Sequence, residues 1–258
     1  MVNAMTLEAC SQALVQAYRS GGRVDAAAMA PVLRSEADAY AVLAQVAQAQ
    51  GWVPADAAPA HWKSGGASRA ATLTHCALAP ESVWPSPANA QGWPMHMRVI
   101  EAEVALRLAR DVDAAQAAQI EAEQAGEWVE AMTVSIELVD SRWQQGLEAP
   151  ALCKLADRQC NSALVLGAWV PFERRDWAQQ VCRVRLDQEP AQEWRGTHSL
   201  QDPTWLLPAW LRHATREGRR VAAGTVVTTG SWVGMLPVAA GQRVEAEFPG
   251  IGRASVQF

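Results

Sequence analysis

The chain carries pairs of glutamates separated by a single alanine, and this spacing could place two carboxylates in one functional site. On a β-strand, residues two apart project from the same face, so both carboxylates of such a pair point into one space. Paired carboxylates are ligands for a hard divalent cation, which also neutralises their mutual repulsion. The Glu-Ala-Glu pattern occurs three times: Glu101 and Glu103, Glu121 and Glu123, and Glu245 and Glu247.

The first pair lies in a segment that alternates as a strand does. One face of RVIEAEVALRL is apolar throughout, and it consists of Ile100, Ala102, Val104, Leu106 and Leu108. The opposite face carries Glu101 and Glu103, so this segment predicts a strand from which two carboxylates project side by side.

The other two copies are predicted to do no chemistry. The second lies in the alanine-rich stretch 113–131, which we expect to form a helix capped by Asp113 with Glu121 and Glu123 on its solvated surface. The third lies in a C-terminal hairpin, where acidic side chains on an exposed strand face are ordinary.

A magnesium site needs more oxygen ligands than two carboxylates supply. In TVSIELVDSRW, the residues Val134, Ile136 and Leu138 share a face, which leaves Glu137 on the other. If that strand lies beside the first, Glu101, Glu103 and Glu137 form a carboxylate trio. The spacing alone leaves a second interpretation open, in which the acids occupy the wet face of an antiparallel sheet.

The remaining patterns predict the elements that position these residues. Residues 6–50 have helical spacing, including a helix that Ser35 caps and Gly51 closes. Residues 69–94 are broken by prolines into what we expect to be a long irregular loop or lid. From residue 98 onward, short alternating segments and a helix near 204–216 predict an α+β fold, divided into a helical segment 1–60 and a β domain 61–258.

Composition excludes several classes of function. The 27 acidic and 22 basic residues give a formal charge of -5, and the basic residues are scattered, so nucleic acid is not expected as a partner. No apolar run is long enough to cross a membrane, and the first residues do not resemble a leader peptide. Five cysteines without zinc spacing favour a reduced, cytoplasmic setting.

Several separated motifs resemble one family, in the correct order along the chain. They are EADAYAVLAQ before the loop from Lys63 to Ser68, VIEAEVALRLARDV, SIELVDSRW, KLADRQCNSALVLG, and the ending AAGTVVTTGS through to Phe258. These motifs resemble the fumarylacetoacetate hydrolase superfamily, and within it the 2-keto-4-pentenoate hydratase and 4-oxalocrotonate decarboxylase branch. The resemblance implies a mixed, strongly bent β-sheet or roll behind a helical N-terminal segment, assembled as a homo-oligomer.

Roles for individual residues follow from that resemblance. It implies that Glu101, Glu103 and Glu137 bind Mg²⁺ or Mn²⁺, and that a small 2-oxo acid chelates this ion. It also makes Lys63 the candidate proton shuttle or carboxylate partner, with a pKa that a nearby metal lowers. The residues that the resemblance assigns to substrate binding are Ser68, Thr229, Gly230 and Ser231. Asp140 is interpreted as buried structural support that needs an arginine partner.

The implied reaction is hydration of a 2-hydroxy-2,4-dienoate or a related 2-oxo acid in aromatic catabolism. Departures from the family pattern keep other reactions open. Asp157 matches an acidic position, but Arg158 follows it where asparagine is common, and the lid lacks an aspartate. Glu81 is a replacement for that aspartate, or a water-activating partner of His75. Decarboxylation, carbon-carbon hydrolysis and a non-catalytic paralogue are therefore the alternatives.

Overall fold

The computed structural model describes residues 6–53 and 58–258. The N-terminal part is helical, as predicted: α1 (Leu7–Ser20), α2 (Ala26–Met29) and α3 (Glu36–Gln50). The Ser35 hydroxyl accepts a hydrogen bond from the backbone N–H of Asp38, and Gly51 ends α3 with φ 70°. The predicted connection between helices and β domain lies partly at residues 54–57, outside the described residues.

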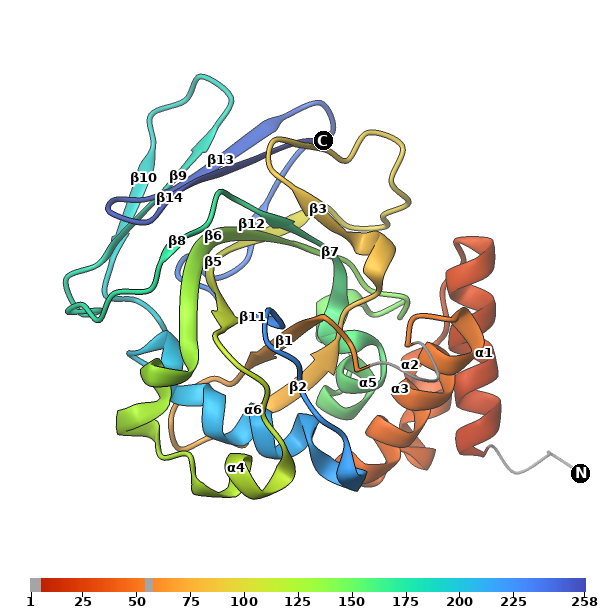
Figure 1. Cartoon of the computed structure of the whole chain (residues 1–258). Helices are drawn as coiled ribbons and strands as arrows, with labels where there is room; N and C mark the ends of the chain where they lie inside the picture. Colours follow the sequence, from red (N-terminus) through yellow and green to blue (C-terminus); the bar gives the residue numbers. More distant parts are fainter. Residues whose placement is uncertain (1–5, 54–57) are drawn as a thin grey trace, which may run out of the picture.

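A large curved sheet forms the body of the molecule. Its strand order is β2-β1-β11-β5-β6-β7-β3, with β12 paired to β5 and β8 to β6. The bounds are β1 (His61–Gly65), β2 (Thr74–Ala77), β3 (Val83–Pro85), β5 (Val99–Leu108), β6 (Val129–Val139), β7 (Asn161–Leu166), β8 (Val170–Pro171), β11 (Val226–Thr228) and β12 (Leu236–Pro237). In Figure 1 this sheet curls so that β1 and β2 face β6 and β7 across an interior.

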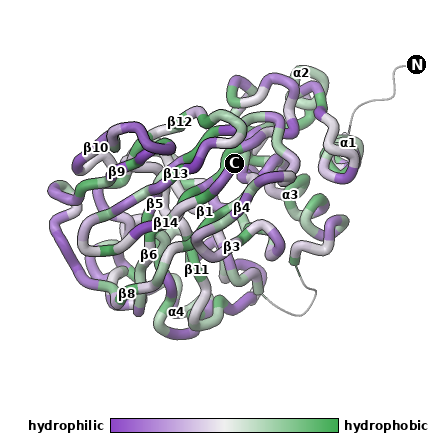
Figure 2. Tube along the Cα trace, turned by 90° about the horizontal axis from the view of Figure 1, so that it is seen from above, coloured by the Kyte–Doolittle hydropathy of each residue, from purple (hydrophilic) through white to green (hydrophobic). Residues whose placement is uncertain are grey.

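A second sheet packs on the outside of β6 and β7. It has the order β10-β9-β13-β14-β4 and consists of β4 (Ala88–Asn89), β9 (Val181–Leu186), β10 (Gln192–Arg195), β13 (Arg243–Phe248) and β14 (Gly252–Gln257). The mixed, strongly bent α+β architecture is therefore the predicted one. In Figure 2 hydrophobic residues follow inner strands such as β6, whereas the periphery around β10 is hydrophilic.

The apolar face predicted for the first Glu-Ala-Glu strand forms part of the main core. Its five members are at most 1% exposed, and they pack with side chains of the second sheet such as Val244 and Phe248. Burying each aliphatic side chain of this kind stabilises the fold by about 1.5–3 kcal/mol. The opposite face of the same strand consequently points into the curl of the large sheet.

Two predictions of local structure were wrong. The stretch 113–131 is not one helix but α4 (Ala114–Gln119), a 3₁₀ segment (Ala122–Trp128) and the start of β6, although Asp113 does cap it. Residues 69–94 are not a structureless lid, because they contain β2, β3 and β4. β2 pairs with the preceding strand β1, whereas β3 and β4 pair with β7 and β14, which are far away in sequence, so local periodicity could not reveal those two.

The other helices lie around the large sheet. They are α5 (Ala151–Ala156) and α6 (Leu207–Ala214), which follows a 3₁₀ turn (Pro203–Leu206). In Figure 1, α6 lies below β1 and β2, and α5 lies toward the N-terminal helices. No helix in the described part of the chain is long and apolar enough to cross a membrane. All five cysteines are buried and free.

Candidate metal centre

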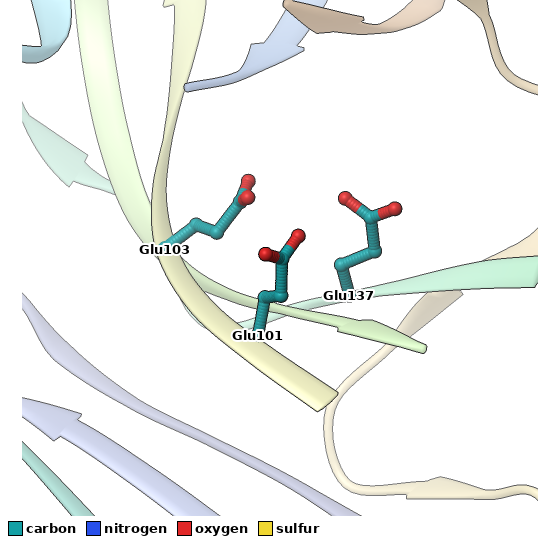
Figure 3. A group of neighbouring side chains, drawn as sticks. All are labelled: Glu101, Glu103 and Glu137. Carbon is teal, nitrogen blue, oxygen red and sulfur yellow. The ribbon is translucent and has the colours of Figure 1, made fainter. Parts of the chain in front are cut away.

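Three glutamates converge inside the curl of the large sheet. Glu101 and Glu103 project from β5 and Glu137 from the neighbouring β6, and one oxygen of each lies within 4.8 Å of the others. Figure 3 shows the three side chains pointing toward one another. Glu101 is 9% exposed, and Glu103 and Glu137 are fully buried. The alternative interpretation, acids on the wet face of a sheet, is therefore wrong for this copy.

The other two copies lie apart from this centre. Glu121 and Glu123 are exposed at the turn between α4 and β6. Glu245 and Glu247 lie on the half-exposed face of β13, where they pair with Arg185 and Arg253 at 2.9 Å each. As predicted, their carboxylates are surface groups.

Each fully buried carboxylate uses one oxygen for the protein and leaves the other free. The Thr228 hydroxyl donates to Oε2 of Glu103, and Ser135 lies 2.8 Å behind Thr228 as a supporting hydroxyl. Oε1 of Glu137 accepts from Asn161 Nδ2 at 3.2 Å. Within the described structure, Oε1 of Glu103 and Oε2 of Glu137 have no hydrogen-bond partner. A buried polar atom without a partner destabilises the fold, so these two oxygens are candidates to bind a ligand.

Lys63 reaches the trio from β1 on the other side of the interior. Its Nζ lies 2.6 Å from Oε1 of Glu137 and 3.9 Å from Oε2 of Glu101. It also donates to the carbonyl of Gln159 at 3.2 Å. Three carboxylates and one ammonium leave a formal charge of about -2 when all are ionised, which one divalent cation would balance.

Burial and mutual repulsion control protonation in this group. Burial raises the pKa of Glu101 to about 7 and that of Glu103 to about 8, and neighbouring carboxylates add to both shifts. For Lys63, burial alone would lower the pKa, but Glu137, Glu101 and Glu103 raise it well above its ordinary value. The expected lowering is therefore not present without a metal, and Lys63 is a cation here.

The donor set fits a hard divalent cation. Carboxylate oxygens are the ligands that Mg²⁺ and Mn²⁺ prefer, and neither sulfur nor imidazole belongs to the cluster. The hydrogen bonds from Thr228 and Asn161 hold Glu103 and Glu137 by their other oxygens, as groups behind metal ligands commonly do.

The four residues assigned to substrate binding lie in different environments. Ser68 is exposed in the loop after β1. The Thr229 hydroxyl donates to the carbonyl of Val104 at 2.7 Å, so the fold already uses it. Gly230 adopts φ 106°, and the half-buried Ser231 hydroxyl donates to the carbonyl of Gly234 at 2.7 Å. Their binding roles stay predictions.

The structure does not bring His75 and Glu81 together. His75 is 4% exposed, and its Nδ1 lies 2.7 Å from the Ser64 hydroxyl. Burial lowers its pKa to about 4, and it lines a cavity of about 790 Å³ with Tyr40 and His213. Glu81 is exposed and lines a different cavity of about 460 Å³. Neither residue belongs to the three-glutamate cluster.

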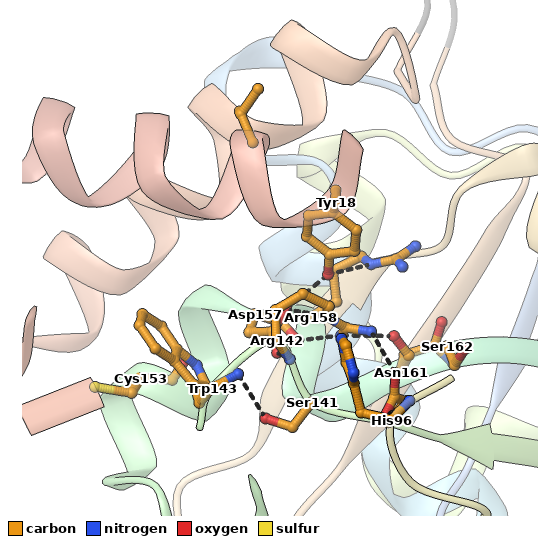
Figure 4. A network of polar contacts seen from close by, with 12 residues as sticks. Tyr18, His96, Ser141, Arg142, Trp143, Cys153, Asp157, Arg158, Asn161 and Ser162 are labelled. Carbon is orange, nitrogen blue, oxygen red and sulfur yellow. Dashed lines mark hydrogen bonds and ion pairs between the residues drawn. The ribbon is translucent and has the colours of Figure 1, made fainter. Parts of the chain in front are cut away.

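Asp157 and Asp140 belong to a buried network beside the centre. Asp157 accepts from the Arg142 guanidinium and from the Tyr18 hydroxyl, each at 2.7 Å. Asp140 lies 4.0 Å from Arg142 and accepts from the backbone of His96 and Met97. Figure 4 shows Asp157 with Arg142 and Tyr18 between α1 and the start of β7. The predicted arginine partner of Asp140 is therefore Arg142.

Sequence reasoning missed the residues that hold the glutamates. Thr228 directly precedes the predicted Thr229, and strand alternation at TVVTTGS could have placed it on the interior face. Asn161 opens β7 after the irregular turn Arg158–Cys160, which has no periodic signal. Gln159 contributes only its carbonyl, which no side-chain pattern reveals.

Comparison with known proteins agrees with this architecture. A family model described as fumarylacetoacetate (FAA) hydrolase C-terminal matches residues 38–258. The chain therefore belongs to the fumarylacetoacetate hydrolase family, as the motifs predicted.

Solved structures extend the similarity of the fold. The 4-oxalocrotonate decarboxylase from Pseudomonas putida G7, complexed with magnesium and adipate, matches with a TM-score of 0.82 over 98% of this chain and 97% of that one, at 18% identity. The 2-hydroxyhepta-2,4-diene-1,7-dioate isomerase from Mycobacterium marinum matches over 78% and 74%, with a TM-score of 0.57 and 17% identity. This similarity of fold extends over nearly the whole chain and therefore includes the N-terminal helices.

Proposed function

We propose that this chain is a lyase that uses Mg²⁺ or Mn²⁺ to hydrate a 2-hydroxy-2,4-dienoate or a related small 2-oxo acid. One observation carries the proposal: three buried glutamates converge within 4.8 Å, and two of their oxygens lack partners. Solved relatives of the same fold are described with magnesium, calcium or manganese, the last together with pyruvate, itself a 2-oxo acid.

Glu101, Glu103 and Glu137 would hold the cation. When bound, such an ion supplies Lewis-acid polarisation of a 2-oxo group and stabilises the negative charge that develops during proton shifts. Three carboxylates occupy only part of the about six positions of a magnesium ion, which leaves room for the carboxylate and oxo oxygens of a substrate. Burial of the site strengthens these interactions by excluding water.

Lys63 would bind the substrate and move a proton. Its raised pKa keeps the ammonium charged, so Nζ is a donor for the substrate carboxylate or for the carbon of a dienol. Nζ lies 2.6 Å from Glu137 and donates to the carbonyl of Gln159 at 3.2 Å. The bond to Gln159 would keep Nζ in place when a substrate replaces Glu137 as its other partner. Protonation at carbon gives the unsaturated ketone to which water then adds.

Decarboxylation is the second candidate. The full-length likeness to a 4-oxalocrotonate decarboxylase favours it, because the same chelate stabilises the charge left when carbon dioxide departs. Hydrolysis of a carbon-carbon bond has less support, since His75 and Glu81 line different cavities.

The test is a two-stage experiment on the whole protein. Magnesium and manganese are titrated into metal-free protein by calorimetry, with and without oxalate, which imitates the 2-oxo carboxylate chelate. A panel of 2-hydroxydienoates and 2-oxo acids is then followed by NMR and by carbon dioxide release. A hydrated product supports the first candidate and carbon dioxide the second. No metal binding and no turnover would support a non-catalytic paralogue.

Assembly and location belong to the same proposal. We expect a cytoplasmic homo-oligomer, and light scattering of the purified chain measures the oligomeric state. A monomer at working concentration would contradict that expectation.

A further inference from the structure

A cavity of about 460 Å³ is lined by none of the three clustered glutamates. Neighbouring residues of β7 point to the two sides: Asn161 donates to Glu137, whereas Ser162 accepts from Trp93 Nε1 at 2.9 Å and lines the cavity. Successive strand residues alternate between faces, so the end of β7 separates the two spaces. The aromatic side chains that line the cavity are Tyr18, Trp52, Trp93 and His96.

Arg158 is the unusual group of this cavity. It is 4% exposed, and its guanidinium lies 4.1 Å from the ring centroid of Trp52 and 5.0 Å from that of Tyr18. Its Nε donates to the Tyr18 hydroxyl at 3.2 Å. Its Nη1 is buried without a hydrogen-bond partner, and no ion pair joins it to a carboxylate of residues 6–53 or 58–258. A buried charged donor without an acceptor is costly.

The nearby aspartates are already engaged. Both oxygens of Asp157 accept from Arg142, through its side chain and its backbone N–H, and the Tyr18 hydroxyl adds a third bond. Oδ1 of Asp140 accepts from two backbone N–H groups, and Oδ2 lies 4.0 Å from Arg142. The two aspartates and the two arginines of this network balance in formal charge, but no oxygen of these aspartates accepts a hydrogen bond from Nη1 of Arg158.

The backbone holds Arg158 in place. Arg158, Gln159 and Cys160 have φ values of 51°, 54° and 62°, a left-handed run that residues with side chains rarely adopt. Their carbonyls accept from Cys76 Sγ at 3.4 Å, from Lys63 Nζ at 3.2 Å and from the Asp140 N–H at 2.8 Å. Strained backbone that its surroundings fix in this way is frequent at ligand sites. The guanidinium is thus preorganised, which lowers the entropy cost of binding.

We propose that this cavity binds a small monocarboxylate with an aromatic or otherwise apolar body. The carboxylate would accept from Nη1 of Arg158, and the apolar body would lie against Trp93. The volume falls within the range of small-molecule sites. The single unpartnered donor Nη1 matches one carboxylate, and Glu81 at the rim disfavours a dianion such as phosphate.

The experiment titrates benzoate into metal-free protein by calorimetry, so it does not depend on the proposed reaction. We expect saturable binding that weakens at least tenfold in Arg158→Gln and stays within twofold in Glu101→Gln. Inorganic phosphate and benzylamine should bind at least tenfold more weakly than benzoate. Trp93→Ala, with its fold checked by circular dichroism, should weaken benzoate binding at least fivefold. This variant provides the test if Arg158→Gln does not fold.

Three results would overturn the proposal. They are the absence of saturable benzoate binding to the wild-type protein, unchanged affinity in folded Arg158→Gln or Trp93→Ala, and a loss of affinity confined to Glu101→Gln. The last result would assign benzoate to the metal centre instead.

Discussion

Glu101 on β5 lies directly opposite Glu137 on β6 in the antiparallel ladder. Like charges at opposed positions destabilise a sheet, and here both side chains are buried as well. Lys63, within 4.0 Å of both, offsets part of the repulsion. An arrangement that costs stability and leaves ligand oxygens free is typical of a functional site.

The first prediction concerns the first of the three Glu-Ala-Glu copies. Glu101→Gln should weaken magnesium binding at least a hundredfold, because the cluster loses a carboxylate ligand and one negative charge. Isothermal titration calorimetry of metal-free protein measures the affinity. Oxalate should strengthen magnesium binding by the wild-type protein but should not restore it in this variant.

Glu245→Gln is the matched control for that variant. Glu245 occupies the equivalent position of the third Glu-Ala-Glu copy, on the half-exposed β13, where it pairs with Arg185. Its substitution should leave magnesium affinity within twofold of wild type. Equal effects of the two substitutions would show that the first copy holds no metal.

Lys63→Met separates metal binding from turnover. The variant removes the ammonium beside Glu137 but no carboxylate, so magnesium affinity should not fall, while turnover of the best substrate should drop at least a hundredfold. Steady-state kinetics and calorimetry on the same preparation measure both quantities. Turnover near the wild-type rate would remove Lys63 from the mechanism.

Strand parity is what made the site predictable. Alternation in RVIEAEVALRL and TVSIELVDSRW correctly assigned Ile100 and Ile136 to the core and the glutamates to the opposite face. It could not say whether that face is wet or enclosed, because the curl of the sheet depends on strands paired across long sequence distances. The family resemblance supplied that part.

Sequence patterns could not predict the contacts that are made through backbone atoms and turns. The carbonyl of Gln159 holds Lys63 from a left-handed turn that has no periodicity. The prediction for 113–131 was wrong for another reason: its alanines favour helix, but strand β6 begins at Val129 because pairing with β5 and β8 outweighs local propensity.

Metal-free protein should lose stability as the pH rises. The pKa of Glu103 is raised to about 8, so its contribution to folding is complete below the ordinary carboxyl range and disappears as the pH rises through about 8. Between pH 5 and 8.5, the free energy of unfolding should fall by a few kcal/mol more in wild type than in Glu103→Gln. Urea unfolding at each pH measures the free energy of unfolding. The histidines titrate in both proteins, so their contribution cancels in the difference between wild type and variant. Parallel curves for both proteins would contradict the prediction.

Thr228→Val tests how Glu103 is held. The change keeps the shape but removes the hydroxyl that donates to Glu103, and loss of such a supporting group typically costs 10–100-fold in metal affinity. Thr229→Val is the neighbouring control, because that hydroxyl donates to the carbonyl of Val104. Calorimetry should find magnesium affinity lowered only in the first variant. An equal loss in both would indicate a general effect on β11.

Asp157 presents the sharpest choice between a structural and a substrate-binding role. Its carboxylate is fully buried and bonded to Arg142 and Tyr18, so Asp157→Asn leaves a buried guanidinium without its main partner. The free energy of unfolding should fall by about 3–5 kcal/mol, with magnesium affinity unchanged within threefold. Asp111→Asn breaks an exposed ion pair with Arg220 but keeps the Oδ1 that accepts from the Ala223 N–H, so it should cost less than about 1 kcal/mol. Normal stability of Asp157→Asn together with a large rise in KM would instead make Asp157 a substrate-binding group.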